Sequence, residues 1–147
     1  RLIDEVGRLL ARVVFKRRAG AHEDALAAVV QGCERLFDLE ADKLFQLTPD
    51  QHYAMLADAD TPEMGRDKIL LYAALNAEAG KVYHALGRAA MARASLLNAL
   101  RLTLRARLEF PVENPPTYAP DVAELRRVLG DEPLDAVTVE LLTAVGY

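Results

Sequence analysis

The chain has 147 residues, of which 52% are hydrophobic and 27% charged, with a formal net charge of −4 and one cysteine. A chain of this length buries roughly 68% of its unfolded surface, so the composition predicts one soluble globular domain over residues 1–147. It excludes disulfide-rich, collagen-like and disordered classes. The longest apolar runs are about five residues, far short of the ~20 that span a bilayer. Because no signal-peptide pattern is present either, we expect a cytoplasmic protein that does not insert into a membrane.

The charges are segregated along the chain. Residues 1–18 carry a net charge of +4, residues 19–63 of −8, residues 64–109 of +5 and residues 110–147 of −5. These alternating blocks indicate that basic and acidic helices face each other, within one chain or across a dimer, and solvated faces that differ only in sign are the alternative. The acidic total argues against a nucleic-acid partner, which requires a concentrated basic surface.

The first 37 residues have the pattern of a helical hairpin. Apolar residues recur at helical spacing in its first half: Leu2, Val6, Leu9 and Val13. Charged residues fall on the opposite face, which is typical of an amphipathic helix. Gly20 suits the left-handed end of that helix, and a second helix is predicted from there to about residue 37. Two helices joined by so short a turn lie antiparallel, so residues 2–37 predict one hairpin.

The following residues, 39–60, have the signals of short helices. Thr48-Pro49-Asp50-Gln51 combines a capping box with a proline at the first helical position. Thr61-Pro62 repeats this start and opens a long helix that we expect to end at Gly87. A further helix follows, so residues 62–108 predict a second hairpin and the short helices before it an insertion.

The C-terminal part, residues 121–146, follows a proline-rich stretch that ends the preceding helix. Asp121 predicts the cap of one short helix, and a second one is expected from Pro133 to about Val145. Their apolar residues are expected to cap the stack of hairpins: Leu125, Val128, Leu129, Leu134, Val137, Leu141 and Leu142. A partner-binding groove is the alternative. If these helices leave the first helix uncovered, a second copy in a symmetric dimer is the expected cover.

The two hairpins are related by a repeat. Aligning Gly20 with Gly87 superposes small residues of both second helices at an offset of 67 residues, about twice the ~34-residue period of tetratricopeptide repeats. Residues 73–106 resemble one such repeat at its characteristic positions: Gly80, Tyr83, Gly87, Ala92, Leu96 and Ala99. The first copy, residues 6–39, has Val13 and Lys16 where that family prefers Gly and Tyr. The chain is similar to a bacterial family of tetratricopeptide-like proteins without an established activity.

This resemblance implies an all-α fold, in which antiparallel helical hairpins stack as a short right-handed superhelix with a helical insertion and C-terminal capping helices. It also implies a concave surface lined by the first helix of each hairpin and suited to a protein or peptide partner. The matching positions are Leu10, Val14 and Arg17 in the first hairpin, and Ala77, Glu78, Lys81 and His84 in the second. Glu78 stands where some relatives need Asn or Arg to bind a C-terminal carboxylate, which argues against that mode of binding.

No arrangement of residues in the sequence is typical of catalysis. His22, His52 and His84 lie on different segments without metal-ligand spacing. Cys33 lies on the apolar flank of its helix, as an inert buried thiol does. The glycines fall at helix ends and crossings rather than in a phosphate-binding loop. We therefore expect no enzyme activity, no metal and no cofactor.

Two functions follow from the sequence as alternatives. The first is a non-enzymatic module for protein–protein interaction or self-assembly, with a homodimer as one form of it. The second is a small-ligand-binding protein or an enzyme, whose pocket would lie between the insertion and the second hairpin near Tyr53, Tyr72, Tyr83 and His84.

Overall fold

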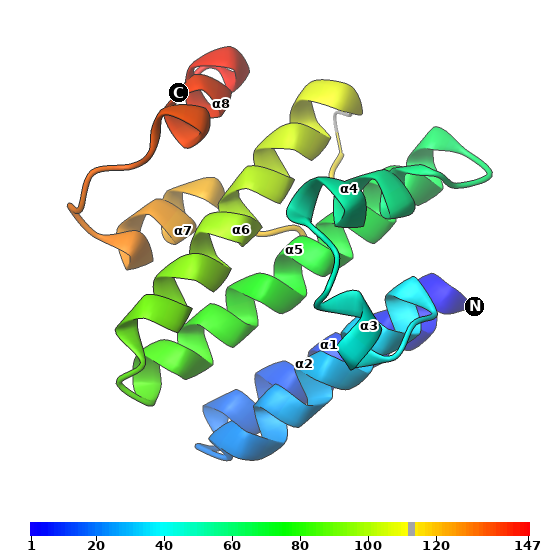
Figure 1. Ribbon diagram of the computed structural model, residues 1–147, viewed down its shortest axis with the longest axis vertical. Coiled ribbons are helices and arrows are strands. Elements are labelled where there is room, and N and C mark those ends of the chain that lie inside the picture. The colour runs from blue at the N-terminus through cyan, green and yellow to red at the C-terminus, as the bar shows by residue number, and fades with distance from the viewer. Residues whose placement is uncertain (112–113) are drawn as a thin grey trace.

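Residues 1–111 and 114–147 are described by a computed structural model, and within them the regular elements are eight α-helices (Figure 1). Their bounds are α1 (Leu2–Arg18), α2 (His22–Phe37), α3 (Ala41–Leu44), α4 (Pro49–Ala57), α5 (Pro62–Ala85), α6 (Ala89–Glu109), α7 (Val122–Leu129) and α8 (Ala136–Val145). The predicted all-α class is confirmed for this part of the chain. Residues 112 and 113, in the predicted proline-rich loop, lie outside it. No described helix is long and apolar enough to cross a membrane.

The two hairpin turns have the same geometry. Gly20 between α1 and α2 has φ +77°, and Gly87 between α5 and α6 has φ +75°. The next residue of each turn donates from its backbone N–H to the carbonyl five residues before it, Ala21 to Lys16 and Arg88 to Tyr83, both at 2.9 Å. This is a Schellman helix end, in which glycine adopts the left-handed conformation without steric cost. The prediction that these glycines end the first helix of each pair is confirmed.

Side-chain caps fix where α4, α5, α7 and α8 begin, and Asp121 forms the predicted cap of α7. Thr48 and Gln51 form the predicted capping box before α4, and Thr61 accepts from the N–H of Met64 at 3.2 Å before α5. The last helix begins at Ala136, later than the predicted start at Pro133. The reason is that Asp135 caps it by accepting from the N–H of Thr138 at 3.2 Å.

Small residues set the helix spacing in the interior. A Cβ added to Gly80 of α5 would lie 2.6 Å from Cγ of Leu96 in α6, and one added to Gly32 of α2 would lie 3.0 Å from Cδ2 of Leu75 in α5. These distances are below van der Waals contact, so larger side chains would push the helices apart.

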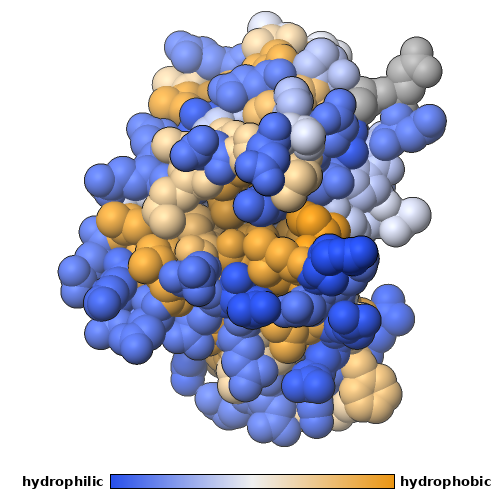
Figure 2. Space-filling model, turned by 90° about the vertical axis from the view of Figure 1, so that its right-hand side faces the viewer, coloured by the Kyte–Doolittle hydropathy of each residue, from blue (hydrophilic) through white to orange (hydrophobic). Residues whose placement is uncertain are grey.

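The α5–α6 hairpin lies between the α1–α2 hairpin and the α7–α8 pair (Figure 1). On the face shown in Figure 2, apolar side chains form a surface patch that is bordered by hydrophilic side chains.

The C-terminal helices pack on α6, whereas α1 packs on α2 and α5. Leu125, Leu129 and Leu142 are buried in a second core cluster with residues of α6. Val137, which was expected to join them, is 58% exposed. The difference follows from the register of α8, which buries Thr138 and Leu142 four residues apart and turns Val137 toward solvent.

The basic face of α6 is paired with acidic residues from other parts of the same chain. Arg101 lies 2.8 Å from Asp135, Arg93 lies 3.1 Å from Glu132, and Arg105 lies 3.2 Å from Asp50. At these contacts the basic and acidic blocks of the sequence face each other within one molecule. Each pair is at least partly exposed, so each contributes on the order of 0.2–1 kcal/mol.

Candidate functional site

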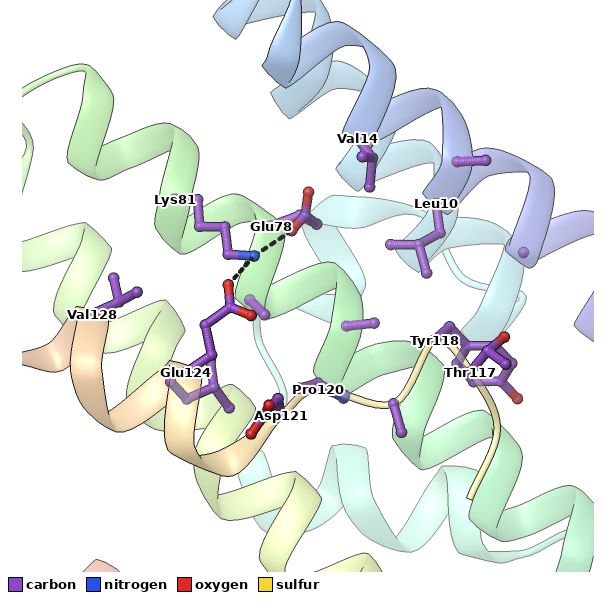
Figure 3. Close-up of a pocket in the computed structure, with 16 residues that line it drawn as sticks. Leu10, Val14, Glu78, Lys81, Thr117, Tyr118, Pro120, Asp121, Glu124 and Val128 are labelled. Atoms are coloured by element: carbon purple, nitrogen blue, oxygen red, sulfur yellow. Dashed lines mark ion pairs between the residues drawn. The ribbon is translucent and has the colours of Figure 1, made fainter. Parts of the chain in front are cut away.

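A groove of about 590 Å³ lies between α1, α5 and the segment formed by residues 117–121 with α7 (Figure 3). Its α1 wall includes Leu10 and Val14, and α5 contributes Ala77, Glu78 and Lys81. Three stretches of chain far apart in sequence therefore build it. Its volume falls within the range of roughly 300–1,000 Å³ typical of ligand sites.

An alternating chain of charges crosses one end of the groove. Arg17 Nε of α1 lies 2.9 Å from Glu78 Oε1 of α5, Glu78 Oε2 lies 3.1 Å from Lys81 Nζ, and Lys81 Nζ lies 3.0 Å from Glu124 Oε1 of α7. Figure 3 shows Lys81 between the two carboxylates. The Glu78 side chain is only 8% exposed, and a buried charge of this kind is tolerated because it is paired on both sides.

The opposite end of the groove is apolar. Leu10 of α1 and Tyr118 of the connecting segment lie there, away from Lys81 and Glu124 (Figure 3). Burial raises the pKa of the Tyr118 phenol above its usual range, so the hydroxyl remains protonated at neutral pH. This end presents hydrophobic surface with the side chains of Thr117 and Tyr118, and the other end presents paired charges.

The structure brings together five of the seven side chains predicted for the concave surface: Leu10, Val14, Ala77, Glu78 and Lys81. Arg17 is bonded to Glu78 but is not among the lining residues. His84 is exposed and lies outside the groove, one turn beyond Lys81 near the end of α5. The prediction that His84 shares this surface is therefore not met by the groove.

The sequence indicates only part of the third wall of the groove. It consists of residues 117–121 and of α7 with Glu124, Leu125 and Val128. For Leu125 and Val128 the sequence predicts a C-terminal cap, with a partner-binding groove as the alternative, because the same apolar spacing suits a helix that caps and one that lines a groove. The contact of Glu124 with Lys81 joins residues 43 positions apart, and no local pattern indicates it.

The alternative pocket beside the insertion is small. It has about 150 Å³ and is lined by Phe45, Tyr72 and Tyr83 among others, below the volume usual for small-molecule sites. Tyr53 lies elsewhere, with its ring 3.7 Å from the guanidinium carbon of Arg105. His84 does not line this pocket either, so only two of the four residues named for it meet there.

The buried His52 belongs to the core instead of a reactive site. Its Nε2 lies 2.7 Å from the carbonyl oxygen of Leu44, and its Nδ1 lies 3.2 Å from the hydroxyl of Tyr72. This pattern fits a neutral imidazole that donates through Nε2 and accepts through Nδ1. Burial raises the pKa of Tyr72 to about 12, so its hydroxyl keeps the proton that it donates. The ring of Phe37 packs edge-on against both.

Burial likewise raises the pKa of the Cys33 thiol to about 12, which leaves very little thiolate at neutral pH. Among residues 1–111 and 114–147, no three His, Cys, Asp or Glu side chains lie together as metal ligands would.

Comparison of the chain with models of known protein families, with curated proteins and with solved structures finds no match. The resemblance to tetratricopeptide repeats therefore stays a prediction from the sequence.

Proposed function

We propose that this chain is a non-enzymatic module for protein–protein interaction, and that the groove between α1, α5 and α7 binds a segment of a partner protein. In this proposal its hairpins form a short tetratricopeptide-like right-handed superhelix, and α7 stands where the first helix of a third unit would. The groove is then the concave surface of the stack.

One observation carries the proposal. Five of the seven positions that the repeat assigns to the concave surface border a single groove. They come from two hairpins whose turns share the same glycine conformation. The repeat assigns these positions from the sequence alone, so their meeting at one groove between α1 and α5 supports the proposal.

The chemistry of the groove suits a short helix or extended peptide with apolar side chains. Leu10, Val14 and Ala77 offer hydrophobic contacts at the α1–α5 side. The Lys81 ammonium has three N–H donors, of which two are directed to Glu78 and Glu124. The third can reach a backbone carbonyl or carboxylate of the bound segment. Because the ionic end is already neutralised, we expect binding to depend mainly on apolar contact and only weakly on salt.

The experiment uses random peptides displayed on phage, selected on the wild-type chain and then synthesised with a fluorescent label. Val128→Arg places a charged side chain in the α7 wall, where Val128 is half-buried, and is expected to weaken binding of the selected peptides at least tenfold. Val139→Arg is the matched control, because Val139 is 47% exposed on α8. It should bind as the wild type does, and so should His84→Ala.

Circular dichroism verifies that each variant folds. Equal binding of the selected peptides to the wild type and to folded Val128→Arg would overturn the proposal, and so would the absence of any enriched peptide.

A further inference from the structure

The outer face of α1 exposes an unusually large apolar side chain. Phe15 is 69% exposed. The neighbours of α1 are α2 and α5, while α7 and α8 pack on α6. A second hollow, of about 470 Å³, opens beside Phe15 and shares Ala11 and Val14 with the groove. No described part of the chain covers this side of α1.

One strip of α1 carries residues at alternating spacings of three and four, as in a helix that packs against another helix. We call this strip, together with the adjacent Phe15, the α1 ridge: Asp4, Gly7, Ala11, Val14, Phe15 and Arg18. It is small in the middle and charged at both ends, with opposite signs.

No contact within the chain explains why residue 7 is a glycine. A glycine inside a helix destabilises it relative to alanine, and the other helix-interior glycines stand where another residue comes close. An added Cβ would lie 2.6 Å from Leu96 at Gly80, 3.0 Å from Leu75 at Gly32 and 3.1 Å from the carbonyl oxygen of Ala57 at Gly65. At Gly7 nothing lies within 4 Å. The missing side chain thus leaves room for something outside the chain.

We propose that two copies of this chain pair through their α1 ridges, antiparallel, about a two-fold axis at Ala11. In this register Asp4 of each copy faces Arg18 of the other, and Phe15 of each covers Gly7 of the other. Ala11 meets its own equivalent, which lets the helices approach closely. A two-fold interface must be complementary to itself, and the ridge meets this condition both in shape and in charge.

The charges at the two ends of the ridge are available for this contact. The Asp4 side chain is 71% exposed, with the backbone nitrogen of Arg1 at 3.9 Å. Arg18 is exposed and forms no salt bridge with any residue that the structure describes. Pairing Asp4 with Arg18 at both ends sets the antiparallel register, because a parallel pair would place like charges opposite each other. Gly7, Ala11 and Val14 of the ridge also line the groove, so pairing and the binding of a segment in the groove should compete. The pairing is tested by mass without any peptide, so its failure is distinguishable from the failure of the proposed function.

The first test is the mass of the wild type by sedimentation velocity over a range of concentrations, against 16.2 kDa for one chain. We expect a reversible dimer. Gly7→Leu adds a good helix former where the isolated chain has room, so thermal stability should be kept or increased. The same side chain occupies the place of Phe15 from the second copy, and dimerisation should weaken by at least about tenfold. A loss of dimer in a stabilised variant cannot be attributed to unfolding.

The second test reverses the charges at the ends of the ridge. Asp4→Arg and Arg18→Asp should each weaken the dimer by about tenfold, since two exposed pairs become repulsive. An equimolar mixture of the two variants should recover it, because both contacts of the mixed dimer are attractive. Lys16→Asp is the matched control for Arg18→Asp, because it makes the same change from a positive to a negative charge on the opposite side of α1. It should leave the dimer unchanged.

Three results would overturn the pairing. They are a wild type that stays monomeric at all concentrations, a dimer unaffected by Gly7→Leu, and a mixture of the charge variants that associates no better than either alone.

Discussion

At the scale of single residues, Gly80 sets the distance between the two longest helices. Its missing side chain lets Leu96 of α6 lie against the backbone of α5, where an added Cβ would meet Cγ at 2.6 Å and Cδ2 at 2.7 Å. The carbonyl oxygen of Ala92 would lie at 3.3 Å. The leucine can give way only by changing its position in the core, and the carbonyl belongs to a helix backbone.

We therefore predict that Gly80→Ala lowers the free energy of unfolding by about 1–3 kcal/mol, the usual cost of overpacking, in spite of the better helix propensity of alanine. Urea denaturation measures it. Gly7→Ala is the control, because nothing lies within 4 Å of a Cβ added at this position. This substitution should stabilise the monomer by about 0.5–1 kcal/mol. Equal effects of the two substitutions would contradict the packing argument.

At the scale of elements, Glu78 joins α1 to α5 and, through Lys81, to α7. The carboxylate is nearly buried, whereas the side chains of Arg17 and Lys81 are 23% and 25% exposed. We predict that Glu78→Gln costs about 1–3 kcal/mol, since it leaves two partly buried cations without their shared partner. Thermal and urea unfolding measure the loss.

Glu124→Gln serves as the control for this prediction. Glu124 is 45% exposed, so its removal should cost no more than about 1 kcal/mol. A loss as large as that of Glu78→Gln would contradict this prediction, because the exposed Lys81–Glu124 pair would then stabilise the fold as much as the pairs of the buried Glu78 do.

Asp135 connects the first turn of α8 to Arg101 of α6. This carboxylate accepts from the hydroxyl and the N–H of Thr138 and pairs with Arg101 at 2.8 Å. The hydrogen bond from Thr138, followed by that from Arg101, holds the pKa of Asp135 below its usual range. A lowered pKa in the folded state means that the carboxylate stabilises α8 above about pH 4 and that this is lost as the pH falls further.

Asp135→Ala is therefore expected to speed amide exchange in α8 by about fivefold at pH 7, as the loss of a helix cap of ~1 kcal/mol does. The methyl signals of Leu142 should also lose the part of their acid transition below pH 4 that the wild type shows. Glu140→Ala, an exposed site on the same helix, should change neither. An Asp135→Ala chain with wild-type exchange would show that packing on α6 alone holds α8.

The features of these elements that could be predicted are local in sequence. The turns at Gly20 and Gly87 and the cap at Thr48 depend on residues within five positions, so the chain itself carries their signal. The Lys81–Glu124 ion pair and the His52–Tyr72 hydrogen bond could not be predicted, because each joins two segments that are far apart in the sequence and related by no periodic pattern. Five residues of the groove were named because the resemblance to tetratricopeptide repeats, at an offset of 67 residues, assigns corresponding positions on two distant helices to one concave surface.

At the scale of the whole molecule, the α5–α6 hairpin is the centre on which the other parts are built (Figure 1). The α1–α2 hairpin packs on it through α5, and the α7–α8 pair packs on it through α6. The groove is therefore a property of three parts together, and it exists only when both outer parts are attached. Substitutions that loosen either part, such as Glu78→Gln, should also weaken binding in the groove.

Methyl NMR of the intact chain, titrated with a peptide selected by display, shows whether the groove binds a partner segment. We expect the signals of Leu10, Val14 and Val128 to move together on titration, while those of the exposed Val137 and Val139 on α8 stay in place. Movement at Val137 and Val139 without change at Leu10, Val14 and Val128 would contradict the proposed function.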